Sequence, residues 1–284
     1  AMGPAARLRL VDERFPMARC LDGSPPPFYH RPATSAAAKD KWFIHHMGGD
    51  FCGYGETWDE WLEDCRKRSH TSLGSSDWYR QHQPSLQLEA QGVDFFDADP
   101  ERSPLMKDWN WVYMVYCDGH YYAGANESRT FVRVPPHNES SPPPPPEELF
   151  FRGRFNVEGI IGTLRADDGL ASASDIVIGG CSSGGVAVFS NADSLHDLLP
   201  ATARVAATAN SGYYLNVNTE SWVKPPMLMA NLTGTLSQPC VESEQWRNTP
   251  WFCIVAEVAA PFVSKMPIFA WESRFDSNQL GWSC

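Results

Sequence analysis

Asp175-Ile-Val-Ile-Gly-Gly-Cys-Ser-Ser-Gly-Gly-Val-Ala-Val-Phe189 is the stretch that decides the fold, because it joins a buried strand, a sharp glycine-flanked turn and the start of a helix. Its centre, Gly180-Cys-Ser-Ser-Gly184, is a G-x-S-x-G motif. In that motif the serine sits on a strained turn with its Oγ exposed above the sheet. The apolar residues on both sides supply the required strand and helix, so we interpret Ser182 as a nucleophile rather than part of a structural Gly/Ser turn.

The same turn indicates the fold class. The helix after Ser182 points its N-terminus at the serine, so backbone N–H groups face any oxyanion that develops there. This context is typical of an α/β fold with an α/β-hydrolase-like sheet flanked by helices. At 284 residues the chain is long for an ordinary domain. Because α/β folds of this size often form one core, we expect a single domain over residues 1–284.

Composition narrows the possible partners. The formal charge of -11 argues against a surface for nucleic acid or anionic membrane, because both need clustered Lys and Arg. The chain has no run of about 18 apolar residues, which predicts that it has no membrane span. No basic, then apolar, then small-residue signal segment opens it. We also expect a monomer that needs no cofactor.

The cysteines and glycosylation sequons indicate an oxidising compartment. None of the eight cysteines falls into paired C-x-x-C spacing, which argues against a zinc site. Three sequons begin at Asn126, Asn138 and Asn231. We therefore expect a secreted protein whose signal peptide is absent from this chain. The abrupt start and end of the sequence lead us to expect that the natural protein extends beyond both.

A second glycine turn follows the β-rich apolar residues 41–47, which we predict to be a strand. Gly48, Gly49 and Asp50 come directly after it. Two interpretations stay open. The loop could form half of an oxyanion hole, where the backbone approaches a substrate closely, or it could be an ordinary tight turn.

Residues 56–70 have the apolar spacing of a helix, with Trp58, Trp61, Leu62 and Cys65 separated by charges. A disulfide between Cys52 and Cys65 would pin this helix to the glycine loop.

Three histidines, His45, His46 and His70, invite a metal interpretation. They lack a carboxylate or cysteine partner at ligand spacing, and adjacent residues on a strand point to opposite faces. We therefore favour structural roles for them.

The other segments complete an alternating α/β pattern. Residues 20–29 read as an irregular lead-in, and residues 137–148 as an exposed Pro-rich loop insert rather than a domain boundary. We predict a helix within 151–170 and strands at 109–116, 204–209 and 266–271.

Two later positions could contribute to a site. In this fold the triad acid follows a later strand, and Asp276 stands just beyond the strand predicted at 266–271. An exposed loop aspartate is the alternative. Tyr213 and Tyr214 follow the strand at 204–209, where they could wall a pocket or simply pack.

Seven short motifs in order give the chain a family resemblance. They are Cys20-Leu-Asp-Gly-Ser-Pro-Pro, Gly48-Gly49 followed by Cys52, Leu73-Gly-Ser-Ser, Tyr116-Cys-Asp-Gly, Arg152-Gly-Arg, Gly180-Cys-Ser-Ser-Gly-Gly185 and Phe275-Asp-Ser-Asn-Gln279. Over nearly its whole length the chain resembles the pectin acetylesterase and Notum family of secreted carboxylesterases. The resemblance implies that Ser182 is the nucleophile and Asp276 the triad acid. It also implies that the N–H groups of Gly49, Asp50 and Ser183 hold the oxyanion.

The chain departs from the family pattern in two ways. Asp50 stands where the family usually has a tryptophan, and so places a carboxylate beside the developing oxyanion. The family's catalytic histidine follows the acid, whereas none of the eight histidines follows Asp276. Serine is a poor nucleophile without a base, so we expect this polypeptide to be nearly inactive alone and the natural protein to continue to a histidine. Sequencing the gene past Cys284 tests this.

Together these features predict a secreted serine carboxylesterase that removes acetyl or similar short acyl groups from a polysaccharide such as pectin. One alternative keeps the machinery but acts on a longer fatty acyl ester, as the Notum branch does. A second alternative, motivated by the missing histidine and by Asp50, is a non-catalytic secreted protein that binds glycans.

Overall fold

The computed structural model describes residues 3–91, 95–134 and 142–283. It contains one eight-stranded sheet and one small two-stranded ribbon. In spatial order the large sheet holds β10 (Ile268–Trp271), β9 (Arg204–Asn210), β8 (Asp175–Cys181), β3 (Lys41–His46), β5 (Asn110–Met114), β2 (Pro27–Arg31), β1 (Ala6–Leu10) and β4 (Ser85–Leu86). Neighbours from β10 to β5 run parallel, and the pairs β5–β2, β2–β1 and β1–β4 are antiparallel.

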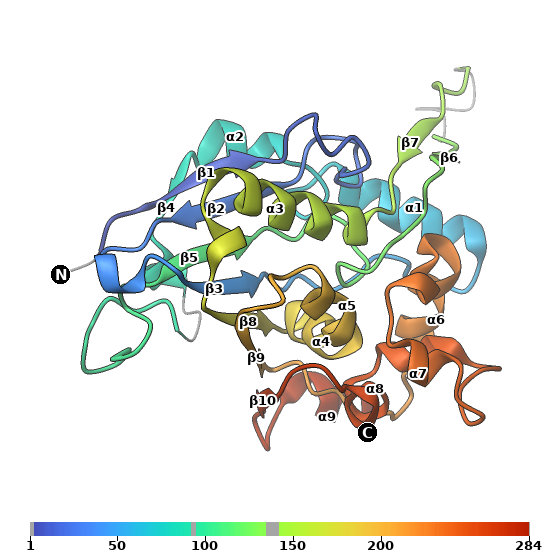
Figure 1. The fold of residues 1–284 in the computed structure, drawn as a ribbon. Helices are drawn as coiled ribbons and strands as arrows, with labels where there is room; N and C mark the ends of the chain where they lie inside the picture. Colours follow the sequence, from blue (N-terminus) through green and yellow to red (C-terminus); the bar gives the residue numbers. More distant parts are fainter. Residues whose placement is uncertain (1–2, 92–94, 135–141, 284) are drawn as a thin grey trace.

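Helices surround this sheet, and the ribbon formed by β6 (Thr130–Val132) and β7 (Glu147–Leu149) projects away from it (Figure 1). The α-helices are α1 (Trp58–Ser69), α2 (Asp77–His82), α3 (Gly153–Asp167), α4 (Ser183–Ser190), α5 (Ala192–Asp197), α6 (Glu220–Ala230), α7 (Gln238–Val241), α8 (Ala256–Ala259) and α9 (Ser277–Ser283). Short 3-10 turns are η1 (Ala36–Ala38), η2 (Leu88–Gln91), η3 (Leu170–Ser172), η4 (Leu232–Gly234), η5 (Pro250–Ile254) and η6 (Ala260–Phe262).

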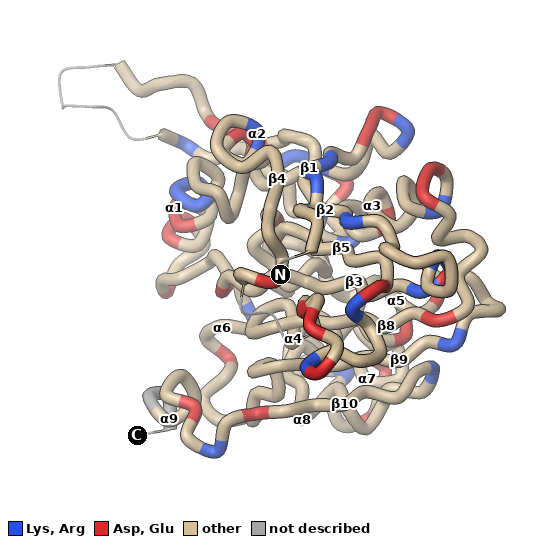
Figure 2. The backbone as a smooth tube through the Cα atoms, turned by 90° about the vertical axis from the view of Figure 1, so that its left-hand side faces the viewer, with Lys and Arg blue, Asp and Glu red and all other residues tan. Residues whose placement is uncertain are grey.

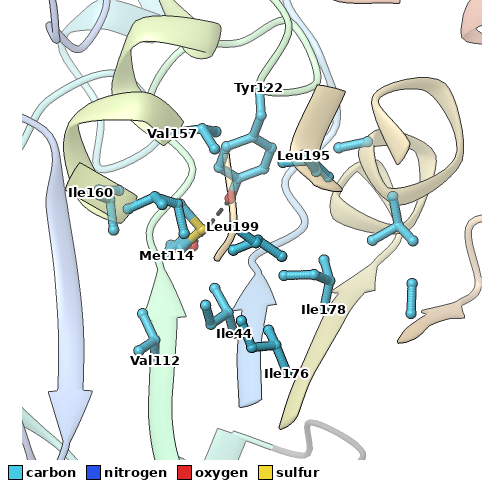
Figure 3. Close-up of a cluster of buried hydrophobic side chains, with 14 of the residues drawn as sticks. Ile44, Val112, Met114, Tyr122, Val157, Ile160, Ile176, Ile178, Leu195 and Leu199 are labelled. Atoms are coloured by element: carbon cyan, nitrogen blue, oxygen red, sulfur yellow. Dashed lines mark hydrogen bonds between the residues drawn. The ribbon is translucent and has the colours of Figure 1, made fainter. Parts of the chain in front are cut away.

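The main core lies between the sheet and the helices α3, α4 and α5, which stand in front of it in Figure 1. The sheet contributes Ile44, Val112, Ile176 and Ile178, and these meet Val157, Ile160 and Leu195 from the helices (Figure 3). Each fully buried aliphatic side chain contributes about 1.5–3 kcal/mol by removal from water. The core also holds a polar group, because the Tyr122 hydroxyl donates to the Met114 carbonyl at 3.1 Å.

The opposite face of the sheet carries a second core of large aromatic side chains, including Tyr29, Phe43, Phe96 and Trp111. Burial on both faces explains why the central strands read as nearly continuous apolar runs. His45 and His46 fit this two-sided arrangement, as predicted. His45 stacks on Tyr113 with ring centroids 5.7 Å apart, whereas the His46 Nδ1 lies 3.0 Å from the Gly179 carbonyl oxygen.

Most of the predicted elements are confirmed. β3, β5, β10, α1 and α3 fall within the predicted segments, and β9 extends one residue beyond its predicted end. The interpretation of 20–29 as irregular is wrong at its end, because β2 begins at Pro27 and lies inside the sheet. Proline is tolerated there since it is the first residue of the strand. The predicted proline-rich loop 137–148 falls partly outside the described residues. Pro142–Pro146 have no regular structure, but the prediction is wrong at its end, because Glu147 and Glu148 belong to β7.

Disulfides and exposed asparagines fit the predictions from composition. The predicted Cys52–Cys65 bond is present, together with Cys20–Cys117 and Cys240–Cys253. Of the sequon asparagines, Asn231 is exposed and Asn126 half-buried, whereas Asn138 lies outside the described residues. Among the helices that the structure describes, none combines the length and the apolar character needed to cross a membrane.

The sheet ends at β10 on one side. Within the described residues, β10 pairs only with β9, and its side chains Phe269 and Trp271 are 65% and 46% exposed. The segment after β10 carries Asp276 and leads into α9.

Candidate active site

The G-x-S-x-G stretch folds into the predicted strand–turn–helix. Ser182 ends the turn between β8 and α4 with φ 54° and ψ -124°, a strained conformation for a residue with a side chain. A Cβ on Gly180 would overlap the Gly184 carbonyl, and a Cβ on Gly184 would overlap the His46 carbonyl at the end of β3. The glycines therefore permit both the tight turn and the close approach of α4 to the sheet.

The loop Gly48–Asp50 lies against this turn. Because β3 and β8 are parallel neighbours, the residues that follow them meet at one edge of the sheet. A Cβ on Gly48 would come within 2.7 Å of the Cys181 carbonyl oxygen, and the Ser183 hydroxyl donates to the Asp50 carbonyl at 3.0 Å. Asp50 itself has φ 63°. The glycine pair therefore lies beside the serine turn, and its part in an oxyanion hole stays a prediction.

Arg68, a residue of α1, fixes the loop by hydrogen bonds to its carbonyl oxygens. Its guanidinium donates to the carbonyl oxygens of Gly49 at 2.5 Å, Phe51 at 3.3 Å and Leu73 at 3.3 Å. It also lies 5.2 Å from the ring centroid of Tyr116. Because carbonyls of the loop are turned toward Arg68, this cation fixes how the peptide groups of the loop are oriented.

A cavity of about 210 Å³ opens at the serine turn. It brings together three of the predicted site residues, Asp50, Ser182 and Ser183, while Gly49 lies beside them in the chain. The rest of its lining is mostly apolar or aromatic and comes from distant parts of the sequence: Phe51, Tyr54, Tyr121, Val186, Tyr214, Trp222 and Asn278. Polar groups that converge between aromatic walls in this way are typical of a small-ligand site.

Tyr214 is the wall residue that touches Ser182. The two side chains share a hydrogen bond, and Tyr214 shares another with Asn278. Burial raises the pKa of Tyr214, and the charges of Asp276 and Glu272 raise it further. Tyr214 therefore lines the pocket, one of the two interpretations left open, whereas the Tyr213 ring packs edge-on against Phe189 at 5.5 Å.

Asp276 lies next to the cavity without lining it. Its carboxylate accepts the Asn278 N–H at 3.0 Å and the Gln279 side-chain amide at 2.9 Å, at the start of α9. Glu272, immediately after β10, accepts the Tyr213 N–H at 3.1 Å. Burial is the main cause that raises the pKa of Glu272, with the Asp276 charge adding to it. Two carboxyl groups thus stand on the β10 side of the cavity.

Asp50 offers its carboxylate to a neighbouring phenol. The Tyr54 hydroxyl donates to Asp50 Oδ2 at 2.9 Å. Burial raises the pKa of Tyr54, and the adjacent Asp50 charge raises it further. The tyrosine therefore stays protonated at neutral pH and remains a donor to the carboxylate.

No described histidine lines the cavity. Burial lowers the pKa of His45, His46 and His120 to about 3, 4 and 3, so these three are neutral at pH 7. His120 does lie within 4.8 Å of the Cys52 and Cys65 sulfurs. Those two sulfurs are joined in a disulfide and are not available as thiolate ligands.

Several lining residues were not predicted from sequence. Tyr54, Tyr121 and Trp222 have no motif around them that marks a site, and Arg68 reads as one of several charges on an amphipathic helix. Tyr121 stands two residues after the end of the Tyr116-Cys-Asp-Gly motif. It has φ 55°, and the next residue, Tyr122, has φ 57°. Two consecutive tyrosines in the left-handed region mark a backbone held by its surroundings.

Comparison with known proteins finds related chains. The family model described as Pectinacetylesterase matches residues 4–283. Pectin acetylesterase 5 of Arabidopsis thaliana is 33% identical over 268 residues, which cover 92% of this chain and 55% of that protein. Palmitoleoyl-protein carboxylesterase NOTUM of Schmidtea mediterranea is 25% identical over 277 residues, with 92% and 47% covered. The chain therefore spans about half the length of the curated relatives it matches.

A solved structure matches the fold. The structure of the Wnt deacylase Notum from Drosophila aligns with a TM-score of 0.74 and 20% identity, covering 99% of this chain and 74% of that one. At this identity the likeness concerns the fold alone, and it confirms the predicted α/β-hydrolase-like sheet flanked by helices.

Proposed function

The chain belongs to the pectinacetylesterase family, and from that premise we propose that it is a serine carboxylesterase that releases acetyl or other short acyl groups from a polysaccharide such as pectin. One observation carries the proposal. Ser182 occupies a strained turn at the N-terminus of α4, in the same cavity as the loop residue Asp50. A serine so placed, facing backbone N–H groups, has the arrangement that acyl transfer requires.

In the proposed reaction the Ser182 Oγ attacks the ester carbonyl carbon while its proton passes to a base. The N–H groups of Gly49, Asp50 and Ser183 hold the oxyanion of the tetrahedral intermediate. When the intermediate collapses, the C–O bond to the sugar breaks and the sugar oxygen takes a proton. Water then adds to the acyl-enzyme, and the acid is released with Ser182 restored.

The base is the part of this proposal that the described residues do not supply. We assign the role of base to a histidine outside the described residues. In the Ser–acid–His triads of this fold that histidine follows the acid in the chain, so Asp276 would orient it. The hydrogen bonds from Asn278 and Gln279 would hold the Asp276 carboxylate in place for that histidine.

The cavity volume supports a short acyl group. About 210 Å³ lies below the range of about 300–1,000 Å³ that is usual for larger ligands. An acetyl group fits such a space, whereas a long fatty acyl chain needs a larger one. Hydrolysis of p-nitrophenyl esters of rising chain length checks this point. We expect the rate to fall steeply beyond a few carbons, and a rate that rises toward long chains would favour the fatty acyl alternative.

We also propose that the protein is secreted and acts as a monomeric single domain. Three disulfides support an oxidising compartment, where such bonds persist. Sedimentation of the protein purified from the medium of expressing cells tests both points.

Labelling with a fluorophosphonate probe tests the catalytic proposal directly. We expect the full-length protein to be labelled and Ser182→Ala to lose labelling completely. Ser221→Ala, which changes an exposed serine on α6, serves as the matched control and should label as the unchanged protein does. Glycan binding without any labelling would contradict the enzyme and support a non-catalytic glycan-binding protein.

A further inference from the structure

The rim of the cavity carries a fixed carboxylate. Asp50 lines the cavity beside Ser182, in a left-handed backbone conformation that aspartate tolerates better than most residues. Its Oδ2 accepts the Tyr54 hydroxyl, and the Tyr54 ring lies 4.4 Å from the ring centroid of Phe51. The side chain is therefore held at the rim by a hydrogen bond and by the packing of its partner.

Other acidic groups surround the same cavity. Asp64 accepts the N–H groups of Gly53 at 2.9 Å and Tyr54 at 3.2 Å, so it lies directly behind the Asp50–Tyr54 pair. Elsewhere around the cavity, the charges of Asp276 and Glu272 act on the lining residue Tyr214. Carboxylates thus stand on two sides of the space in which a substrate would sit.

The nearby cation, Arg68, does not line the cavity, and its charge affects the pKa of Tyr54 less than burial and Asp50 do. Arg68 directs its guanidinium at the carbonyls of Gly49, Phe51 and Leu73. Among the residues that line the cavity there is no Lys or Arg. Along the backbone seen from the opposite side of the molecule, Lys and Arg are interspersed with Asp and Glu rather than gathered in one stripe (Figure 2). The described residues therefore provide no cationic site for an anionic polymer beside Ser182.

We propose that the Asp50–Tyr54 pair selects acetylated sugars without charge, such as a neutral glycan or a methyl-esterified uronan, over sugars with free carboxylates. The inference rests on the proposed esterase function and specifies its substrate class. Asp50 would accept a hydroxyl hydrogen of the sugar that bears the ester, a charge-assisted bond that hydroxyl groups can make. A uronate carboxylate brought to the same rim would meet the like charge of Asp50, which is exposed there, with no Lys or Arg among the lining residues to offset it.

Binding of two matched ligands tests this proposal without depending on turnover. The ligands are an acetylated oligogalacturonide with free carboxylates and the same oligosaccharide with methyl-esterified carboxyls. Calorimetric titration into Ser182→Ala, made in the full-length protein, gives both dissociation constants. We expect the methyl-esterified form to bind about threefold to fivefold more tightly at low salt. The ratio should shrink at about 1 M salt, where the Debye length falls to about 3 Å.

Variants assign the effect to the rim. Asp50→Asn is introduced into the Ser182→Ala protein. It keeps the backbone N–H, and asparagine tolerates the left-handed conformation. We expect this variant to bring the ratio of the two dissociation constants close to one. Glu13→Gln removes the same charge from an exposed position between β1 and β2, and it should leave the ratio unchanged. Thermal unfolding of each variant checks that it is folded.

Each result decides the proposal. Equal binding of the two ligands, tighter binding of the free acid, or no binding of either overturns the selectivity. A ratio that survives Asp50→Asn also overturns the role of the pair. Fluorophosphonate labelling and hydrolysis of p-nitrophenyl acetate by the protein with Ser182 intact test the esterase function separately. If those fail while the ratio persists, the charge selectivity belongs to a glycan-binding protein.

Discussion

Arg68 is the single residue on which the geometry of the glycine loop depends most. It makes three hydrogen bonds to carbonyl oxygens, two of them in the segment that follows β3. A lysine cannot replace it, because one ammonium lacks the planar fork that reaches several carbonyls at once. Arg68 touches no cavity space, so we regard it as a positioning residue that acts through the backbone.

Replacing Arg68 should therefore impair the chemical step more than binding. We expect Arg68→Met to lower kcat for p-nitrophenyl acetate by about 10-fold to 100-fold, somewhat less than the loss of an oxyanion donor itself. KM should change little, and Arg68→Lys should recover only a small part of the rate. Steady-state kinetics of the full-length protein, with added guanidinium ion as a chemical rescue, make the measurement.

Arg80→Met is the matched control for Arg68, because Arg80 is an exposed arginine on α2 that pairs with Asp77 at 3.1 Å. It should keep the full rate. A normal kcat in folded Arg68→Met would show that the loop holds its shape without the guanidinium.

Helix α4 is the element that unites fold and site, because its first turn packs directly on the end of β3. Gly184 meets the His46 carbonyl, and Gly185 lies against Gly212 after β9, where a Cβ would approach the Gly212 Cα to 2.9 Å. The helix is buried along its whole length. Small residues at these positions let α4 lie close to three neighbouring strands.

A methyl group at Gly184 should separate α4 from the sheet. We expect Gly184→Ala to lower the free energy of unfolding by about 1–3 kcal/mol, the usual cost of overpacking, and to abolish fluorophosphonate labelling of Ser182. Denaturant unfolding and labelling of the same preparation measure both effects. Gly234→Ala is the control, since a Cβ there meets only the tip of Arg154 at 3.5 Å. Full labelling of Gly184→Ala would contradict this account of the helix.

The elements that sequence predicts well are those whose pattern is local. β8 and α4 carry an apolar strand, a glycine turn and an apolar helix within 15 residues, and β3 and β5 read as strands for similar reasons. β2 was missed in part because its prolines and turn formers obscure a strand that is specified by pairing with β1 and β5.

The residues of the site differ in the same way, because some lie in local sequence motifs and others do not. Ser182, Ser183 and Asp50 lie in or beside short motifs, and the structure brings them into one cavity, while their catalytic roles stay predictions. Tyr54, Tyr121 and Trp222 reach that cavity through long-range packing of segments more than 60 residues apart. No local pattern records such contacts. The role of Asp276 stays a prediction, since its carboxylate is tied to α9 and stands beside the cavity rather than in it.

Buried ionisable groups set how the whole molecule responds to pH. His45, His46 and His120 have their pKa values lowered by burial to about 3, 4 and 3, whereas burial raises the pKa of Asp118 to about 6. Because burial lowers the pKa of these histidines, they stabilise the folded protein above about pH 6.5. This stabilisation is lost as the pH falls toward the pKa values that the histidines have in the folded protein. The raised pKa of Asp118 has the opposite effect, because the stabilisation of the fold by this residue is lost as the pH rises from about 4 to 6.

We expect the effect of the three histidines on the free energy of unfolding to exceed the opposite effect of Asp118. Between about pH 4 and pH 6 the unfolded chain binds three protons on these histidines that the folded chain lacks, and the folded chain holds one on Asp118. The net difference of two protons predicts that stability falls by about 3 kcal/mol for each pH unit lost. Denaturant titrations at pH 7, 6 and 5 measure the slope. His45→Gln should make it shallower by about one proton, and stability that rises toward pH 5 would contradict the prediction.

The two margins of the sheet differ in what they offer to another polypeptide. β4 is two residues long and gives little backbone for pairing, whereas β10, paired within the described residues only with β9, presents the exposed rings of Phe269 and Trp271. A strand arriving at β10 finds backbone partners and aromatic surface together. At high protein concentration, during expression or purification, we therefore expect aggregates to grow by the addition of strands to the β10 edge of the sheet and not to the β4 edge.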